Sequence, residues 1–283
     1  MTNLKVMTDS SAQLTPAEIE KYHITVVPLS INIDGQVYTD GVDLTREEFV
    51  EKMDAAELLP ETSQPSVGLF AEKIKELTAD GSHVLGIFLS SGLSGTIEAA
   101  RQAAEMVPGA EVTCFDSKYT DRAQAFQVLA ACQDIAAGKD LPAVLDHLHA
   151  IQDKMHLDMM VVNLKNIIKG GRLGPVAGRV ATLLNIRIAI TMTDGKIDLQ
   201  KKGRGKKFTH KYVEEIIAYL AKHPEVKQVG ISYVDTPTEM EQLADRIKEV
   251  RPDLEILTRV TSPIVAIHAG REAFAVMFYP EQI

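Results

Sequence analysis

Short apolar runs alternate with amphipathic, helix-length segments along the first half of the chain. Strands are predicted over residues 4–8, 24–27, 84–89 and 111–115. Helical periodicity fills the segments between these runs. This alternation is typical of a parallel sheet, because parallel neighbours need a helical crossover connection. The N-terminal part is therefore expected to be an α/β unit with a doubly wound parallel sheet.

The pattern changes near Met159, beyond which strand-like runs dominate. They cover residues 159–162, 187–202, 226–234 and 254–260, and two closing strands are predicted around Ile267 and Val276. The long helical stretch over residues 121–151, interrupted at Gly138 and Pro142, carries the crossing between the two parts. We therefore expect two domains, an N-terminal α/β domain over residues 1–155 and a C-terminal α+β domain with a mixed sheet over residues 156–283.

Local turn and cap signals refine this prediction. The pairs Asp34-Gly35 and Asp194-Gly195 lie inside alternating runs and predict tight hairpins. The first of these hairpins, over residues 29–39, is expected to join the second sheet. Capping boxes are predicted to begin helices at Thr15, Thr45 and Thr236.

Hydroxyl-rich turns lie at the ends of the predicted elements. They are Thr8-Asp9-Ser10-Ser11, the segment from Thr62 to Ser66, and the segment from Ser90 to Thr96. Since the carboxyl ends of parallel strands face the ligand crevice of an open α/β sheet, three such turns suggest one site. An equally weighted alternative is that Ser11, Ser66 and Ser94 are helix caps and that Asp9 closes an Asx-turn.

The third turn has the most specific chemistry. Ser94, Gly95 and Thr96 open an amphipathic helix, and the free N–H groups of a helix N-terminus favour an anion. His268 ends an apolar run expected to be a strand. A lone histidine there is more often a core residue, but beside the hydroxyl cluster it would donate a hydrogen bond to a carboxylate. An acid-binding site between the two domains is the resulting hypothesis.

Composition excludes several classes of protein. The 283 residues are 45% hydrophobic and 24% charged, which is typical of a globular protein. A net charge of −9 argues against nucleic-acid binding. No apolar run is long enough to span a bilayer and no signal-peptide pattern opens the chain, so a cytoplasmic location is expected. The two cysteines are too few for a metal knuckle or a disulfide framework.

Several motifs together resemble the DegV family of fatty-acid-binding proteins, over nearly the whole chain and in the family's order. They are Thr8-Asp-Ser-Ser, Val27-Pro-Leu, Asp40-Gly, Thr62-Ser-Gln-Pro-Ser, Leu89-Ser-Ser-Gly-Leu-Ser-Gly-Thr96, Lys169-Gly-Gly-Arg-Leu-Gly174 and the cluster Arg204, Lys206 and Lys207. Two segments depart from the family's usual pattern, residues 116–122 and residues 269–272. Both are positions that would shape an acyl tunnel.

The resemblance implies a lipid-binding subunit of a bacterial fatty acid kinase, with no catalytic machinery, cofactor or metal of its own. It would hold a long-chain fatty acid in an apolar tunnel between its domains, and a separate kinase subunit would phosphorylate the carboxylate for phospholipid synthesis. By motif, Thr62, Ser94, Gly95 and His268 would bind the carboxylate. Supporting and partner-docking residues would be Ser63, Ser91 and Thr96, and Arg172, Arg204, Lys206 and Lys207, respectively.

Two other functions remain as alternatives. Ser94, Asp235 and His268 follow the chain order of an α/β-hydrolase triad, although the β-branched Thr96 replaces the small residue that a nucleophile elbow needs. A nucleotide-dependent enzyme is disfavoured because neither phosphate-binding fingerprint occurs. The stretch Lys201–Lys211 holds six basic residues and no acidic one. It is either a solvated segment or a docking patch for an acidic partner or, transiently, an anionic membrane.

Overall fold

The N-terminal part is built on a parallel four-stranded sheet. The computed structural model describes residues 3–180 and 186–280. In this sheet the order is β2-β1-β6-β7, with β1 (Leu4–Asp9), β2 (Thr25–Val27), β6 (His83–Phe88) and β7 (Val112–Asp116). Each of the four strands predicted there is confirmed to within two residues at either end.

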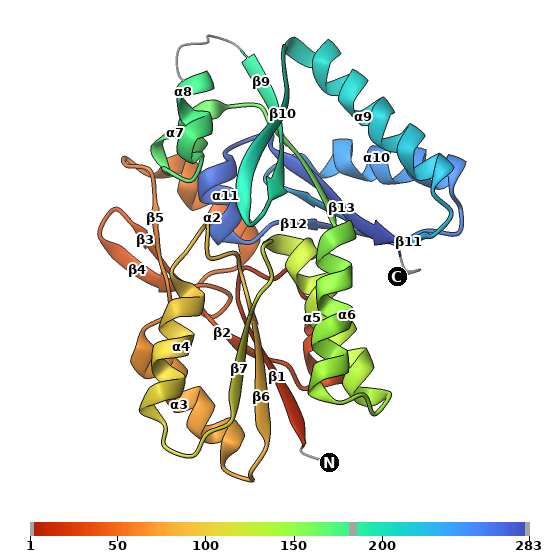
Figure 1. Ribbon diagram of the computed structural model, residues 1–283. Coiled ribbons are helices and arrows are strands. Elements are labelled where there is room, and N and C mark those ends of the chain that lie inside the picture. Colours follow the sequence, from red (N-terminus) through yellow and green to blue (C-terminus); the bar gives the residue numbers. More distant parts are fainter. Residues whose placement is uncertain (1–2, 181–185, 281–283) are drawn as a thin grey trace.

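Helices cover both faces of this sheet, as expected for a doubly wound unit (Figure 1). One face carries α3 (Val67–Thr78) and α4 (Thr96–Met106), and the other carries α5 (Asp121–Ala136), against which α6 (Leu141–Lys154) packs. α1 (Pro16–Tyr22) connects β1 to β2. The capping boxes predicted at Thr15 and Thr45 are confirmed, and they begin α1 and α2 (Arg46–Ala55).

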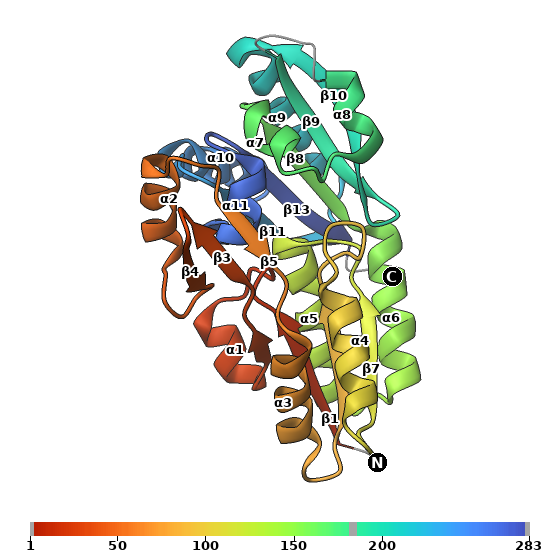
Figure 2. The same ribbon diagram turned by 90° about the vertical axis from the view of Figure 1, so that its left-hand side faces the viewer.

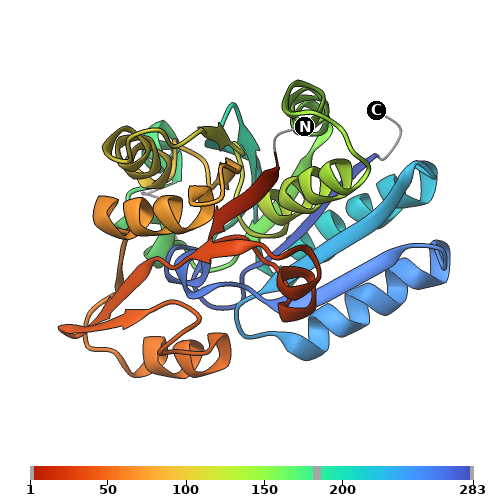
Figure 3. The same cartoon turned by 90° about the horizontal axis from the view of Figure 1, so that it is seen from below.

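The Asp34-Gly35 hairpin forms as predicted, but its place in the fold differs from the expectation. Its strands β3 (Ser30–Ile33) and β4 (Gln36–Thr39) pair with β5 (Glu61–Ser63) in a separate antiparallel sheet of order β4-β3-β5. Figure 3 shows this small sheet and α2 projecting to one side of the parallel sheet. The expectation that the hairpin joins the second large sheet is wrong, because β5, a strand that the sequence pattern did not reveal, pairs with β3 instead.

The C-terminal part is a mixed six-stranded sheet of order β10-β9-β8-β13-β11-β12. Its strands are β8 (His156–Val161), β9 (Ile186–Thr193), β10 (Lys196–Arg204), β11 (Val226–Tyr233), β12 (Glu255–Val260) and β13 (Phe274–Pro280). The predicted Asp194-Gly195 hairpin joins β9 to β10. α9 (Gly205–Lys222) and α10 (Pro237–Val250) pack on one face of this sheet. The remaining short helices are α7 (Leu164–Lys169), η1 (Gly174–Val176), α8 (Ala177–Val180) and α11 (Pro263–Ala269).

Two local predictions in this part are wrong. The segment around Ile267 is helix α11 and not a strand, because Ser262 caps it and Pro263 occupies its first turn. An apolar run of this length fits a buried helix as well as a strand. Thr236 precedes α10 without forming a side-chain cap, and its Oγ1 is buried with no partner among the described residues.

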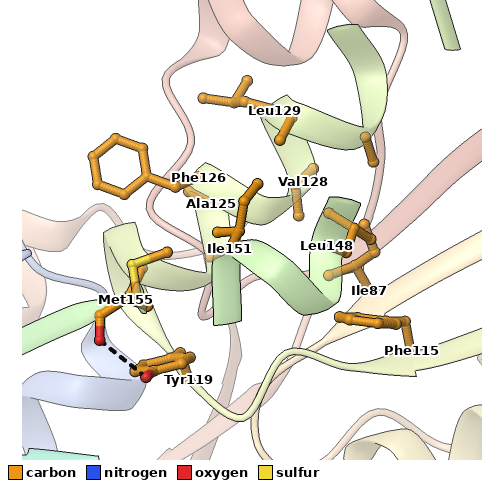
Figure 4. Packing of buried hydrophobic residues seen from close by; sticks show 14 of the residues in the cluster. Ile87, Phe115, Tyr119, Ala125, Phe126, Val128, Leu129, Leu148, Ile151 and Met155 are labelled. Carbon is orange, nitrogen blue, oxygen red and sulfur yellow. Dashed lines mark hydrogen bonds between the residues drawn. The ribbon is translucent and has the colours of Figure 1, made fainter. Parts of the chain in front are cut away.

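A shared core joins the two large sheets. α5 is buried on nearly all sides, because it packs on β1 and β6 of the parallel sheet and on β11 and β13 of the mixed sheet. Figure 4 shows Phe126, Val128 and Leu129 of this helix within the cluster, and Tyr119 donating a hydrogen bond to the Met155 carbonyl at 3.1 Å. The expected domain boundary falls between α6 and β8, and the two parts stack along the long axis of the molecule (Figure 2).

Candidate ligand-binding site

A cavity of about 370 Å³ lies between the two parts of the molecule. Its volume is within the range of small-molecule sites, about 300–1,000 Å³. Its wall comes from β5, the start of α4, the start of α5, α7, α11 and four strands of the mixed sheet. The cavity is therefore shared by elements that lie far apart in the sequence.

Five of the seven residues predicted to hold or support a carboxylate line this one cavity. They are Thr62, Ser63, Ser94, Gly95 and His268. The two others do not line it. Thr96 is fully buried and its hydroxyl contacts Ser94 Oγ at 2.9 Å, while Ser91 is exposed and donates its backbone N–H to Asp116.

Strand register explains the position of Thr62. In the β4-β3-β5 sheet, Ile31 of β3 lies opposite Thr62 of β5. Ile31 is fully buried, so the face that it shares with Thr62 is the inner one. Ser94 reaches the same cavity from the turn before α4, whose N-cap is Gly95, and Gly95 itself is exposed on the cavity rim. Hydroxyls from two different sheets thus converge.

His268 comes to the cavity from the C-terminal end of α11. Burial, together with the nearby Arg172 guanidinium, lowers the pKa of His268 to about 4. The imidazole is therefore neutral near pH 7, with one nitrogen that donates and one that accepts a hydrogen bond. Its Nδ1 is buried without a hydrogen-bond partner among the described residues. A Cβ at Gly170 would lie 2.3 Å from this atom, so the ring packs directly on the end of α7.

Arg172 supplies the permanent positive charge in the cavity wall. It follows α7 and is half-buried, and its guanidinium donates to the carbonyls of Leu93 at 3.4 Å and Gly170 at 2.6 Å. These bonds connect the mixed-sheet part to the turn that carries Ser94. The other basic residues predicted for partner docking, Arg204, Lys206 and Lys207, are exposed at the β10–α9 junction and do not line the cavity.

The opposite wall is an apolar floor that the sequence analysis missed. It is one face of the mixed sheet, formed by alternate residues on four adjacent strands: Leu157 and Met159, Ile190 and Met192, Ile197, and Ala275 and Met277. The only sequence signal for it was the two-residue period of these strands, because residues i and i+2 face the same side. A polar and an apolar half therefore meet in one cavity.

The Thr8–Ser11 turn, predicted as part of the site, does not line the cavity. Thr8, Asp9 and Ser11 are completely buried. Asp9 accepts hydrogen bonds from the Ser11 and Leu89 backbone N–H groups at 3.0 and 2.8 Å and from Gln124 Nε2 at 3.0 Å. Burial nevertheless raises the pKa of Asp9. The alternative interpretation applies to this turn, since Asp9 closes an Asx-turn and joins β1, β6 and α5.

The residues of the alternative hydrolase triad are not connected as a triad. Ser94 Oγ contacts Thr96, not an imidazole. Asp235 pairs with Arg271 and accepts the Glu272 N–H, and in the part of the chain that the structure describes nothing bonds to His268 Nδ1. Neither the orienting carboxylate nor the activated hydroxyl of such a site is in place. Across residues 3–180 and 186–280, no group of three histidine, cysteine or acidic residues is placed to hold a metal ion.

No helix in the described ranges has the length and apolar character that crossing a membrane requires. Three solved structures resemble this fold. The DegV family protein of Thermus thermophilus, described as fatty acid binding, aligns with a TM-score of 0.88 at 28% identity, covering 99% of this chain and 100% of that one. The fatty acid binding DegV family protein SAG1342 of Streptococcus agalactiae gives 0.88 at 29%, covering 99% of each chain. The DegV protein of Bacillus subtilis gives 0.92 at 24%, covering 99% of this chain and 100% of that one, and supports the fold alone.

Sequence relatives give the same assignment. A DegV domain-containing protein of Streptococcus pneumoniae is 39% identical over 279 residues, which is 98% of both chains. One from Listeria innocua is 38% identical over 285 residues, covering 99% of this chain and all of that one. A family profile described as "Uncharacterised protein, DegV family" matches residues 3–281. With this coverage, the chain belongs to the DegV family.

Proposed function

We propose that the protein binds one long-chain fatty acid in the cavity between its two parts and presents the carboxylate to a partner kinase. The observation that carries this proposal is the division of a single cavity into a polar end and an apolar floor. Hydroxyls, a neutral imidazole and a guanidinium line the first, and seven apolar side chains of the mixed sheet form the second. The fatty acid binding relatives from Thermus thermophilus and Streptococcus agalactiae support the same ligand class.

The polar end fits a carboxylate. Thr62 and Ser94 would donate from their hydroxyls, His268 from its protonated ring nitrogen, and Gly95 from its backbone N–H. Because His268 is neutral at pH 7, the compensating charge comes from Arg172. Hydrogen bonds to a charged group contribute about 1.5–3 kcal/mol each, so this set fixes the head group firmly.

The apolar floor provides most of the affinity measured from water. Each buried methylene contributes about 0.8 kcal/mol, so a long acyl chain gains roughly 10 kcal/mol. A fatty acid in a bilayer already has its tail in hydrocarbon, and transfer to the protein gains little from this source. Head-group contacts therefore decide uptake from a membrane and the orientation of the bound acid.

Presentation to a kinase follows from the position of the polar end. Ser63 and Gly95 are exposed beside the less accessible Thr62 and Ser94, so this end of the cavity reaches the surface. A carboxylate held there would be accessible to a second protein that brings ATP and its metal ion, and holding the acceptor oxygen in place is this chain's contribution. The exposed residues Arg204, Lys206 and Lys207 would dock that partner or, transiently, a membrane surface.

The double variant Thr62→Ala/His268→Ala tests the head-group assignment. We expect it to retain bound lipid, because the floor is intact, but to give no acyl phosphate with the kinase subunit and ATP. Ser91→Ala is the matched control, since it removes an exposed hydroxyl from the same loop as Ser94 without touching the cavity. Full phosphorylation of the acid bound to the double variant would contradict the assignment.

A further inference from the structure

The apolar floor is unusually rich in methionine. Of the ten methionines in the chain, Met159, Met192 and Met277 line the cavity. Met277 is fully buried, Met192 is 8% exposed and Met159 is half-buried. Met159 also packs against three separate core clusters, so it lies where the core between the two sheets, the α2–α11 core and the α7 core meet.

Strand pairing places these three side chains in two successive rows. In the first row, Met159 of β8 lies between Ile190 of β9 and Ala275 of β13. In the second row, Met277 pairs with Leu157, and Met192 pairs with Ile197 of β10. The rows are about 7 Å apart along the strands, since each residue advances the strand by about 3.4 Å.

The order of the rows gives the direction of the cavity. Val161 and Ile188, one step before the first row, pack with Ile167 in the core around α7. His268 packs on Gly170 at the end of α7, so the polar end lies on that side. An acyl chain held at its carboxylate would therefore cross the row of Met159 first and the row of Met192 and Met277 afterwards.

Methionine differs from the other floor residues in its freedom to change shape. Its side chain has three rotatable bonds and a polarizable sulfur, which let it fill irregular gaps. Isoleucine, which flanks the methionines at positions 190 and 197, is stiff at its first torsion. The middle of the floor can thus follow a bent chain, while its edge on β9 and β10 keeps its shape.

We propose, on the basis of the fatty acid function above, that Met159, Met192 and Met277 determine acyl selectivity and make the cavity accept straight and kinked chains alike. The ligand class is long-chain acids regardless of a cis double bond in mid-chain. Discrimination among acids is then made at the carboxylate, and the floor adapts to whichever chain follows it.

The test is a competition between stearic acid and oleic acid, its cis-monounsaturated counterpart of equal length, for delipidated protein, read as the ratio of the two bound acids by mass spectrometry. The wild type is expected to bind both within about threefold. The variant Met159→Ile/Met192→Ile/Met277→Ile is expected to favour the saturated acid by about tenfold or more, because shape differences of this size in apolar pockets are worth 10–200-fold.

Met160→Ile is the matched control. Met160 is fully buried on the same strand as Met159 but faces the α9–α10 side of the sheet. It reports the cost of the substitution in β8 while the cavity floor is unchanged, so its acid ratio should equal that of the wild type. Where the triple variant does not fold, Met159→Ile alone is measured, and a shift of about threefold is expected.

Two results would overturn the inference: a wild-type protein that already discriminates more than about tenfold, or a folded triple variant whose acid ratio equals that of the wild type. A wild-type protein that binds neither acid would instead refute the proposed function. The two failures are therefore distinguishable in one experiment.

Discussion

Replacing Gly170 by alanine should displace His268 without straining the backbone. Gly170 ends α7 with φ −66°, a conformation open to any residue. The added Cβ would lie 2.3 Å from His268 Nδ1 and 3.1 Å from Cε1, where ordinary contacts begin at 3.4 Å. The imidazole must therefore move by about 1 Å, which is enough to break a well-aligned hydrogen bond.

The expected loss is that of one hydrogen bond to a charged head group, about 1.5–3 kcal/mol. This corresponds to roughly a tenfold to hundredfold weaker transfer of fatty acid from vesicles to the protein. Folding stability should hardly change, because alanine is favoured over glycine by about 1 kcal/mol in helices and offsets part of the steric cost.

The assay is uptake of a fluorescent fatty acid from phospholipid vesicles by delipidated protein, with thermal unfolding measured in parallel. Gly178→Ala is the control, since Gly178 lies in the neighbouring helix α8 and an added Cβ would meet nothing within 4 Å. Normal uptake by Gly170→Ala, together with impaired uptake by His268→Ala, would show that the Gly170 contact does not position the ring. Normal uptake by both would remove His268 from the head-group site.

Three further outcomes are expected. The pKa of His268 lies at about 4 in the folded protein against 6.5 as its ordinary value, so the unfolded chain binds the extra proton first. Stability of the ligand-free protein should therefore fall between pH 6.5 and 4 by up to about 3 kcal/mol more than that of His268→Gln, as measured by urea unfolding. Burial raises the pKa of Asp40 to about 6, so the sign reverses: relative to Asp40→Asn, the wild type should gain stability as the pH falls from 7 to 4, and a parallel pH dependence of the two would contradict this. Both Gly35 and Gly195 have positive φ, but only at Gly195 would a Cβ meet a side chain, Ser90 Oγ at 2.7 Å, so Gly195→Ala should lower the melting temperature more than Gly35→Ala, and equal shifts would refute this.

Much of the architecture was predictable because local signals agree with it. The parallel strands, both Asp-Gly hairpins and the caps at Thr15 and Thr45 each depend on a few neighbouring residues. Ile267 failed because β-branched residues favour a strand, whereas Ser262 and Pro263 begin a helix and its burial against α2 and the β3 strand stabilises it. Tertiary packing decided that segment.

The candidate site was predictable only at its polar end. Hydroxyls at Thr62 and Ser94 interrupt apolar patterns, so they stand out in a sequence, and the structure brings both to one cavity. Met159 and Met277 look like any other strand residues, and only the pairing of β8 with β13 shows that they share a floor. The Thr8–Ser11 turn carries similar hydroxyls, but its side chains bond inward to Asp9 and Gln124.

The most direct test of the account is native mass spectrometry of the purified protein beside Ala275→Trp. Ala275 is a small, 5%-exposed residue of the floor next to Met159, and an indole there would fill the space that an acyl chain needs. The account predicts one fatty acid per wild-type chain and none on a folded Ala275→Trp variant. A wild-type protein that carries no fatty acid and takes up none, or a variant that keeps a full complement, would contradict it.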